Sequence, residues 1–156
     1  MALHIRSLQA AGQSVLYLAA DRPQRQLVAS FEGAGVDAEK VEVLDVVTCM
    51  DGRVPSVKPA RTTFLPSPTM LEMMAMRLEQ MASRMTSPVV VVDSLNTLAL
   101  YNGLGAVQEF SHYLANRLRT RSIAGDFIIR DGKDGKSLQE MVATFTDERL
   151  LLTGAP

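Results

Sequence analysis

Short apolar runs alternate along the chain with longer segments in which apolar residues recur at helical spacing. Runs rich in Val, Ile and Leu that are continuously apolar, rather than alternating with polar residues, are typical of parallel strands covered on both faces. The runs that predict strands cover residues 14–21, 41–47, 88–94, 125–131 and 149–153. Residues 62–65 could form one further short strand.

The segments between these runs predict helices. In the helix predicted at residues 67–85, Ser67 is the expected N-cap and Pro68 is the expected first helical residue, because proline suits the first turn. Met70, Met74, Leu78, Met81 and Met85 form its apolar face, which we interpret as core, with an adaptable partner surface as the alternative. The predicted helices cover residues 22–35, 67–85, 106–122 and 136–145.

Alternation of strands and helices determines the predicted fold class. Buried parallel strands with intervening helices favour an α/β protein built as a three-layer α-β-α sandwich with a mainly parallel sheet. The length of 156 residues suits one domain over residues 1–156. Residues 48–66, which hold three prolines, form the expected irregular segment.

Composition narrows the classes of partner and of site. The chain is 47% hydrophobic and 21% charged, with a net charge of -1, so a strongly electrostatic partner such as nucleic acid or an anionic membrane is disfavoured. No apolar stretch approaches the length of a bilayer span, and no signal peptide is recognisable. Cys49 is the single cysteine, which excludes an internal disulfide and a thiolate-rich metal site. These features predict a cytoplasmic protein.

A Gly-Lys-Ser triplet at residues 135–137 suggests a phosphate-binding loop. A P-loop requires a further glycine five residues before the triplet, and Arg130 occupies that place. Two interpretations remain. In the first, the loop is a polar turn and Ser137 caps the last helix. In the second, Lys133, Lys136 and Ser137 bind an anion weakly at a helix N-terminus.

The sequence VVVVDS at residues 89–94 gives a second candidate site. Four apolar residues followed by Asp form the Walker B pattern, which places a carboxylate beside Mg²⁺ at the carboxyl end of a buried parallel strand. A buried strand also often ends in an Asp that only caps the next loop. A Walker B strand normally follows its P-loop, whereas the Gly-Lys-Ser triplet comes later here.

Two long segments, residues 14–48 and 89–131, together resemble the RecA/KaiC-like ATPase superfamily, and in particular a divergent, mostly archaeal KaiC-like branch that lacks the Walker A P-loop. The most specific part of the resemblance is Asp93-Ser94-Leu95-Asn96-Thr97-Leu98, with Tyr101-Asn102. The resemblance covers roughly residues 12–152. It implies a RecA/KaiC-like core in which Asp93, Ser94 and Asp21 are the candidate residues for nucleotide and Mg²⁺.

The departures from this family pattern matter for function. The P-loop of active relatives would precede the helix equivalent to residues 3–12, and the pair of acidic residues that acts as general base is reduced here to Asp21. The resemblance therefore implies a domain that is not an enzyme, with no cofactor. It also implies that a central strand is missing, so that the sheet must close the gap, use another strand or lean on a partner chain. We expect it to act by contact with another protein or with itself, as a homodimer or larger homo-oligomer. The alternative is a nucleotide-binding switch or weak ATPase in which Asp93 holds Mg²⁺ and ATP is held by an unusual or partner-supplied loop.

Two groups of polar residues give weaker signals. Arg117, Arg119 and Arg121 lie near the end of a predicted helix, where we expect a solvated basic end that complements the helix dipole. His4 and His112 have no neighbours at ligand spacing, so no metal site is predicted.

Overall fold

The computed structural model describes residues 1–56 and 59–152 and has a single parallel sheet at its centre. Five strands pair in the order β3-β2-β1-β4-β5, and each pair of neighbours is parallel. This confirms the predicted α/β class. The strands are β1 (Ser14–Ala19), β2 (Val41–Asp45), β3 (Thr62–Phe64), β4 (Pro88–Asp93) and β5 (Ala124–Ile128).

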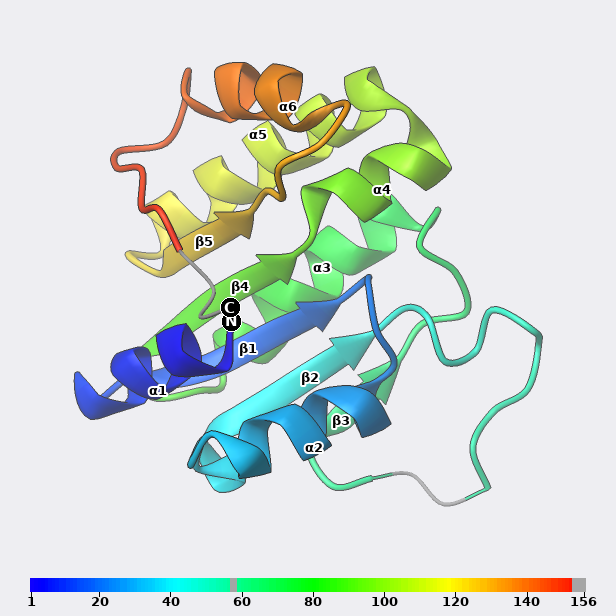
Figure 1. Cartoon of the computed structure of the whole chain (residues 1–156), viewed down its shortest axis with the longest axis vertical. Helices are drawn as coiled ribbons and strands as arrows, with labels where there is room; N and C mark the ends of the chain where they lie inside the picture. Colours follow the sequence, from blue (N-terminus) through cyan, green and yellow to red (C-terminus); the bar gives the residue numbers. More distant parts are fainter. Residues whose placement is uncertain (57–58, 153–156) are drawn as a thin grey trace.

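Helices cover both faces of the sheet, as Figure 1 shows. One face packs against α1 (Ala2–Ala10) and α2 (Gln24–Gly33), through Ile5, Leu27 and Phe31. The short 3-10 helix η1 (Ala38–Lys40) precedes β2. The other face is covered by α3 (Leu71–Ala82), α4 (Leu95–Asn102), α5 (Leu104–Thr120) and α6 (Gly135–Val142).

The central strands are buried on both sides, which explains why their sequences do not alternate. In β1, Leu16 and Leu18 pack into the core beneath α3 to α6, whereas Val15 and Tyr17 pack into the core beneath α1 and α2. Successive side chains of a strand point to opposite faces, so a strand between two helical layers must be apolar at every position.

The sheet closes without a gap at its centre. β1 pairs directly with β2 on one side and with β4 on the other, and it takes the middle position of the five strands. The family resemblance implies a missing central strand, but the described strands leave no opening where such a strand would lie.

Two details of the predicted helix at residues 67–85 are wrong. The helix begins at Leu71 with Met70 as its N-cap, so neither Ser67 nor Pro68 starts it. Ser67 instead accepts a hydrogen bond from the Thr69 amide at 3.2 Å, and the Pro68 carbonyl accepts one from Asn102 at 3.0 Å. These bonds hold residues 67–69 in a turn beside α4, and the helix begins only after this turn. Of the predicted apolar face, Met74, Leu78, Met81 and Met85 do pack on the core, whereas Met70 is the N-cap.

The expected strand at residues 149–153 is absent from the part that the structure describes. Residues 149–152 have no regular structure and pair with no strand, and Thr153 lies outside the described residues. The run is apolar enough for a buried strand, but none of the described strands lies along it to supply backbone partners.

The arginines near the end of α5 are not a purely solvated group. Arg117 binds Glu79 of α3 through two hydrogen bonds of 2.9 and 2.7 Å, and Arg121 donates to the same carboxylate at 2.8 Å. Hydrogen bonding to Arg117 lowers the pKa of Glu79 despite the opposing effect of burial. Arg119 instead lies beside Asp147 at 3.3 Å. Two of the three arginines therefore join α5 to α3.

Within the residues that the structure describes, no helix is both long enough and apolar enough to cross a bilayer.

Candidate functional site

Three charged side chains from different strands meet at the carboxyl edge of the sheet. Asp93 is the last residue of β4, Asp21 follows the end of β1 by two residues, and Arg130 follows the end of β5 by two residues. Because the strands are parallel, their carboxyl ends lie at the same edge (Figure 1). The fold thus brings together Asp93, Ser94 and Asp21, the three residues proposed from the sequence.

Arg130 lies between the two carboxylates and binds both. Its Nε donates to Oδ2 of Asp21 at 2.7 Å, and its Nη2 donates to Oδ1 of Asp93 at 2.7 Å. The carboxylate of Asp93 is 1% exposed, whereas the Arg130 side chain is 47% exposed. One guanidinium therefore neutralises a fully buried charge and a second, mostly buried one. We call Asp21, Asp93 and Arg130 the carboxylate–arginine cluster.

The backbone of Arg130 is fixed by a single side chain of α4. Asn96 accepts a hydrogen bond from the Arg130 amide through Oδ1 at 2.7 Å and donates to the Arg130 carbonyl through Nδ2 at 3.1 Å. Both backbone groups of the residue are thereby held. This clamp sets the position from which the guanidinium reaches the two carboxylates.

The remaining carboxylate oxygens are also hydrogen-bonded. Tyr17, which is buried in β1, donates its hydroxyl to Oδ2 of Asp93. Oδ1 of Asp21 accepts from the hydroxyls of Ser94, at 2.8 Å, and Thr97. Ser94 is also the N-cap of α4. Every oxygen of the two carboxylates thus has at least one donor within the protein, as buried charges require.

These contacts shift the pKa of the groups in the cluster. Burial alone would raise the pKa of Asp21, but hydrogen bonds from Thr97, Ser94 and Arg130 outweigh it and lower that pKa. Burial raises the pKa of Tyr17 strongly, and the neighbouring Asp93 adds to the effect. Burial opposes the charge of Arg130, but the two carboxylates outweigh this and raise its pKa. At neutral pH the stable arrangement is therefore a charged Asp21 and Arg130 with a neutral Tyr17.

A second buried carboxylate at the same edge has a different environment. Asp45 ends β2, and its Oδ1 accepts from the amides of Val47 and Thr48, both at 2.8 Å. Its Oδ2 accepts from the Gln24 amide at 2.7 Å and from the Thr48 hydroxyl at 2.6 Å. Asp45 thus joins the end of β2 to the start of α2.

The Gly-Lys-Ser triplet lies in the first turn of α6 and outside the carboxylate–arginine cluster. Lys136 is 89% exposed and lies 3.9 Å from Glu140 one turn later, and Lys133 and Ser137 are also exposed. Ser137 does not cap the helix, because α6 begins at Gly135 and Asp134 is its N-cap. Gly135 starts the turn because a Cβ there would lie 2.6 Å from the Arg130 carbonyl oxygen, so only glycine fits.

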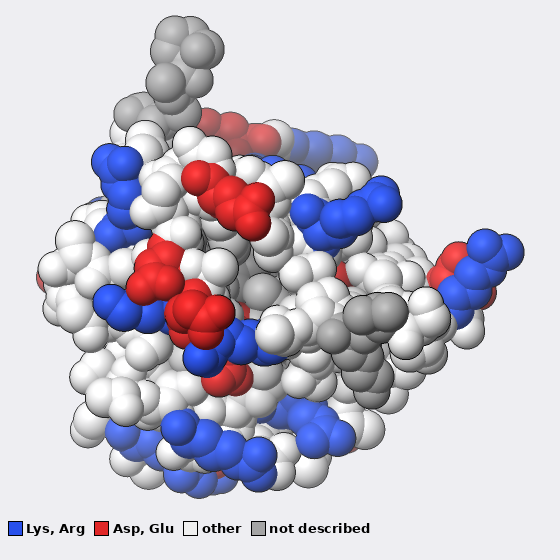
Figure 2. All heavy atoms as spheres, turned by 90° about the horizontal axis from the view of Figure 1, so that it is seen from below, with Lys and Arg blue, Asp and Glu red and all other residues white. Residues whose placement is uncertain are grey.

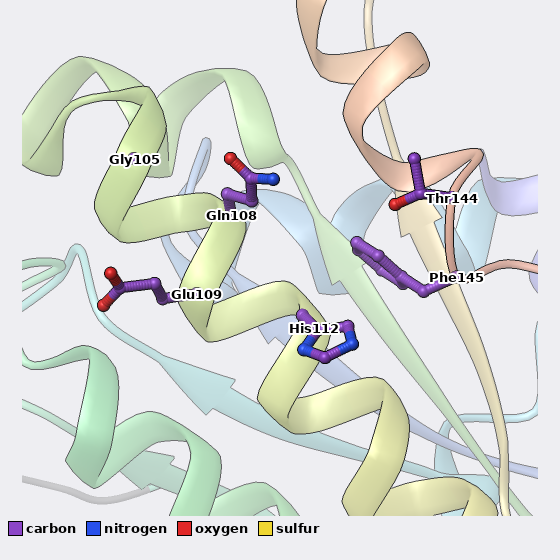
Figure 3. Close-up of a pocket in the computed structure, with 6 residues that line it drawn as sticks. All are labelled: Gly105, Gln108, Glu109, His112, Thr144 and Phe145. Carbon is purple, nitrogen blue, oxygen red and sulfur yellow. The ribbon is translucent and has the colours of Figure 1, made fainter.

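A surface hollow lies apart from this site. A hollow of about 440 Å³ lies between α5 and the segment after α6 (Figure 3), where His112 packs edge-to-face on Phe145. It shares no residue with the carboxylate–arginine cluster. Among the described residues, no group of three or more His, Cys, Asp and Glu side chains could hold a metal ion. Figure 2 shows basic and acidic side chains interspersed over much of the face in view.

Comparison with known proteins gives a family without an assigned activity. The profile of a family of unknown function (DUF7504) matches residues 3–149. The chain belongs to this family. No protein of curated function matches the sequence.

Solved structures show that this chain shares its fold with an uncharacterized protein and with a KaiC-like protein. The uncharacterized protein PH0321 from Pyrococcus horikoshii, solved in complex with an unknown peptide, is similar with a TM-score of 0.67 and 12% identity. The match covers 94% of this chain and 67% of PH0321. The KaiC-like protein PH0186 from Pyrococcus horikoshii OT3 has a TM-score of 0.59 and 13% identity, over 81% of this chain and 54% of that protein. The DUF7504 chain thus spans about half the length of PH0186.

Sequence reasoning missed Arg130, Tyr17 and Asn96 as members of the site. Arg130 was noted only because it stands where a P-loop needs glycine. Its place just after an apolar strand was the available signal, since the residues that follow parallel strands gather at one edge. Tyr17 is the one residue with a polar side-chain group among residues 15–19 of β1. A buried hydroxyl requires a partner, which points to a nearby carboxylate.

Proposed function

We propose that this DUF7504 protein is a non-catalytic KaiC/RecA-like domain, of a divergent branch without a P-loop, that acts through protein contact as a regulatory or scaffold module. The observation that carries the proposal is the position of Arg130 between Asp21 and Asp93, 2.7 Å from each. A guanidinium here supplies the positive charge that Mg²⁺ would bring to a Walker B carboxylate.

The bonding of the cluster disfavours both parts of nucleotide hydrolysis. Mg²⁺ prefers several oxygen ligands in near-octahedral geometry. To bind Asp93 it would have to displace Arg130 and accommodate the Tyr17 hydroxyl. Asp21 is a poor general base, because its oxygens accept three hydrogen bonds and its lowered pKa weakens its affinity for a proton.

The loop at residues 133–137 adds little to a phosphate site. The ammonium of Lys136 lies near Glu140 on the exposed side of α6. A phosphate cradle needs several backbone amides that converge on one point, which the spacing of glycines in this loop does not supply. Among the described residues, the carboxylate–arginine cluster thus has its own cation, Arg130, but no loop that could hold the phosphates of ATP.

Two observations support a role in protein contact. Large apolar side chains are exposed at several places, including Leu100, Met76 and Leu151. PH0321, which has the same fold, was solved with an unknown peptide bound. We propose that this chain likewise binds a protein segment or a second copy of itself, as a homodimer or larger homo-oligomer.

Calorimetric titration with ATP and ADP, with and without Mg²⁺, tests the proposal. We expect no heat of binding and no ATPase activity above background. Arg130→Ala should create affinity for a divalent ion, measured with Mn²⁺ by electron paramagnetic resonance, because the two carboxylates then lose their internal cation. Arg119→Ala is the matched control, since Arg119 is 51% exposed and binds Asp147 and the Phe145 carbonyl outside the carboxylate–arginine cluster.

The opposite results would favour the second function, a nucleotide-binding switch or weak ATPase. Magnesium-dependent ATP binding that weakens in Asp93→Ala or Lys136→Ala would show that the wild-type protein holds phosphate. Turnover that Asp93→Ala abolishes would refute a non-catalytic role.

A further inference from the structure

One edge of the sheet is open at a strand that is long enough to accept a partner. Among residues 1–56 and 59–152, β5 pairs only with β4, so the backbone groups on its outer edge have no strand beside them. Its end is apolar, with Phe127, Ile128 and the following Ile129 only partly buried. Its single charged residue, Asp126, binds His4 at 2.8 Å. The edge therefore lacks the lysines or prolines that usually prevent pairing.

The other edge of the sheet is a weaker acceptor. β3 has three residues, Thr62–Phe64, of which two are threonines. Pairing with so short a strand would form few backbone hydrogen bonds. We therefore expect strand addition at β5 rather than at β3.

A segment with the properties of a strand lies unpaired in the same chain. Leu150, Leu151 and Leu152 are 65%, 77% and 46% exposed and have no regular structure. A continuous apolar run of this kind suits a strand that is covered on both faces. Three adjacent exposed leucines are an unfavourable solvent-facing surface unless another chain covers them.

This segment leaves the protein beside β5. Phe145, which precedes it, packs edge-to-face on Phe127 with ring centroids 6.1 Å apart. Arg119 donates to the Phe145 carbonyl at 3.0 Å and fixes the chain at that point. The leucines follow this contact by five to seven residues, and they form no ladder with their own β5.

We propose that residues 150–152 of one copy add as a strand to the β5 edge of a second copy, and that the exchange is reciprocal about a two-fold axis. Alternating side chains would place Leu150 and Leu152 on one face and Leu151 on the other. Phe127 and Ile129 pack into the core on one face of β5, and Ile128 packs into the core on the other. The added strand would thus extend both apolar layers. This inference rests on the proposed role in protein contact and names its partner.

Light-scattering mass measured over a range of concentrations of the whole 156-residue chain tests this pairing. We expect a dimer whose dissociation constant rises at least about tenfold in Leu151→Glu, because a carboxylate in the added strand would enter an apolar layer. Leu100→Glu is the matched control, because Leu100 is 81% exposed on α4, and we expect it to leave the dimer intact. Hydrogen exchange should show protection, in the dimer, of those amides at residues 127–129 that point away from β4, and loss of that protection in Leu151→Glu.

Each other result overturns the inference. A wild-type monomer with an unprotected edge excludes strand exchange, and a monomer with protected β5 amides means that the chain's own leucines cover the edge. A dimer that survives Leu151→Glu, or that Leu100→Glu breaks, uses a different surface. The outcomes are separable from the proposed function: a monomer without nucleotide binding refutes only this inference, whereas a Leu151-dependent dimer with Asp93-dependent ATP turnover refutes only the non-catalytic role.

Discussion

Asp45 and Asp93 occupy equivalent places on either side of β1, since both are register partners of Ala19. Both end an apolar strand and both are almost fully buried. They differ in what holds them. Asp45 accepts from three backbone amides and one hydroxyl, mostly within three residues of itself, whereas Asp93 binds side chains from β1 and from the residues after β5.

This difference separates a carboxylate held by its local turn from one held by a distant cation. Backbone amides are neutral donors that come with the local turn, so Asp45 needs no cation and acts as a cap. Asp93 depends on a positive charge that reaches it from a distant part of the chain, since Arg130 lies 37 residues away. The predictions below test whether the two carboxylates differ in this way.

Asp45→Ala should give the largest loss of stability. It leaves the amides of Gln24, Val47 and Thr48 without their acceptor at a buried site, which we expect to cost about 3 kcal/mol. Urea unfolding monitored by circular dichroism measures it. Asp37→Ala is the control, since Asp37 caps η1 at an exposed position through one amide, and its loss should cost about 0.5–1 kcal/mol. Equal losses for the two variants would show that the buried hydrogen bonds of Asp45 stabilise the fold no more than those of an exposed cap.

Arg130→Met should destabilise the fold by about 2 kcal/mol, less than for a fully buried pair because water can reach the half-exposed arginine site. The loss arises from Asp93, which remains buried without its cation. Adding Asp93→Asn should therefore recover part of the stability, as a double-mutant cycle would show.

The same cycle distinguishes the two carboxylates. Asp45→Asn combined with Arg130→Met should give additive losses, because Asp45 has no contact with Arg130. Additive losses for Asp93 as well would mean that Arg130 does not act as its counter-ion.

The fold was largely predictable from the sequence, whereas the contacts of the site were not. Continuous apolar runs predicted the parallel strands correctly, because burial on both faces leaves a clear pattern. Residues 149–152 show the limit of that signal. The run is apolar, but a strand also needs a neighbouring strand, and none lies along it in the part of the chain that the structure describes. The contacts of Arg130 with Asp21 and Asp93 span 109 and 37 residues, so no local pattern could indicate them. Glu79 was missed for the same reason, since its partners lie 38 and 42 residues away.

Tyr17→Phe should cost about 1.5 kcal/mol at neutral pH, because Asp93 loses a buried donor. The pKa of Tyr17 is raised in the folded state, so its neutral hydroxyl contributes stability that is present below the unfolded pKa of about 10 and is lost as the pH rises beyond it. The difference between wild type and Tyr17→Phe should therefore shrink above about pH 10. Unfolding curves at pH 7 and pH 10.5 would measure this, and a constant difference would show that Tyr17 ionises normally.

Acid should weaken the cluster through Asp21. Its pKa is lowered in the folded state, so its contribution to stability is present above the unfolded pKa of about 3.9 and is lost as the pH falls through the folded value. Asp21→Asn should therefore show a flatter dependence of stability on pH below about pH 4 than wild type. Glu79 also has a lowered pKa and contributes to the same loss of stability in acid. Glu79→Gln is therefore the control: the effect of Asp21→Asn on the pH dependence of stability should be the same with and without it. Parallel curves for wild type and Asp21→Asn would contradict the assignment.

Lys136→Ala should have the smallest effect, within about 0.5 kcal/mol of wild type, although Lys136 belongs to the triplet that most resembles a nucleotide site. Its side chain is 89% exposed and its contact with Glu140 is a surface pair 3.9 Å long, which salt and water screen. If the lysine served a phosphate, the change would weaken the binding of ATP or of inorganic phosphate while leaving the fold intact. Unchanged unfolding, together with background-level heats of titration, would show that Lys136 is an ordinary residue of a solvated turn. Arg130 would then remain the cation that the carboxylates of Asp21 and Asp93 require.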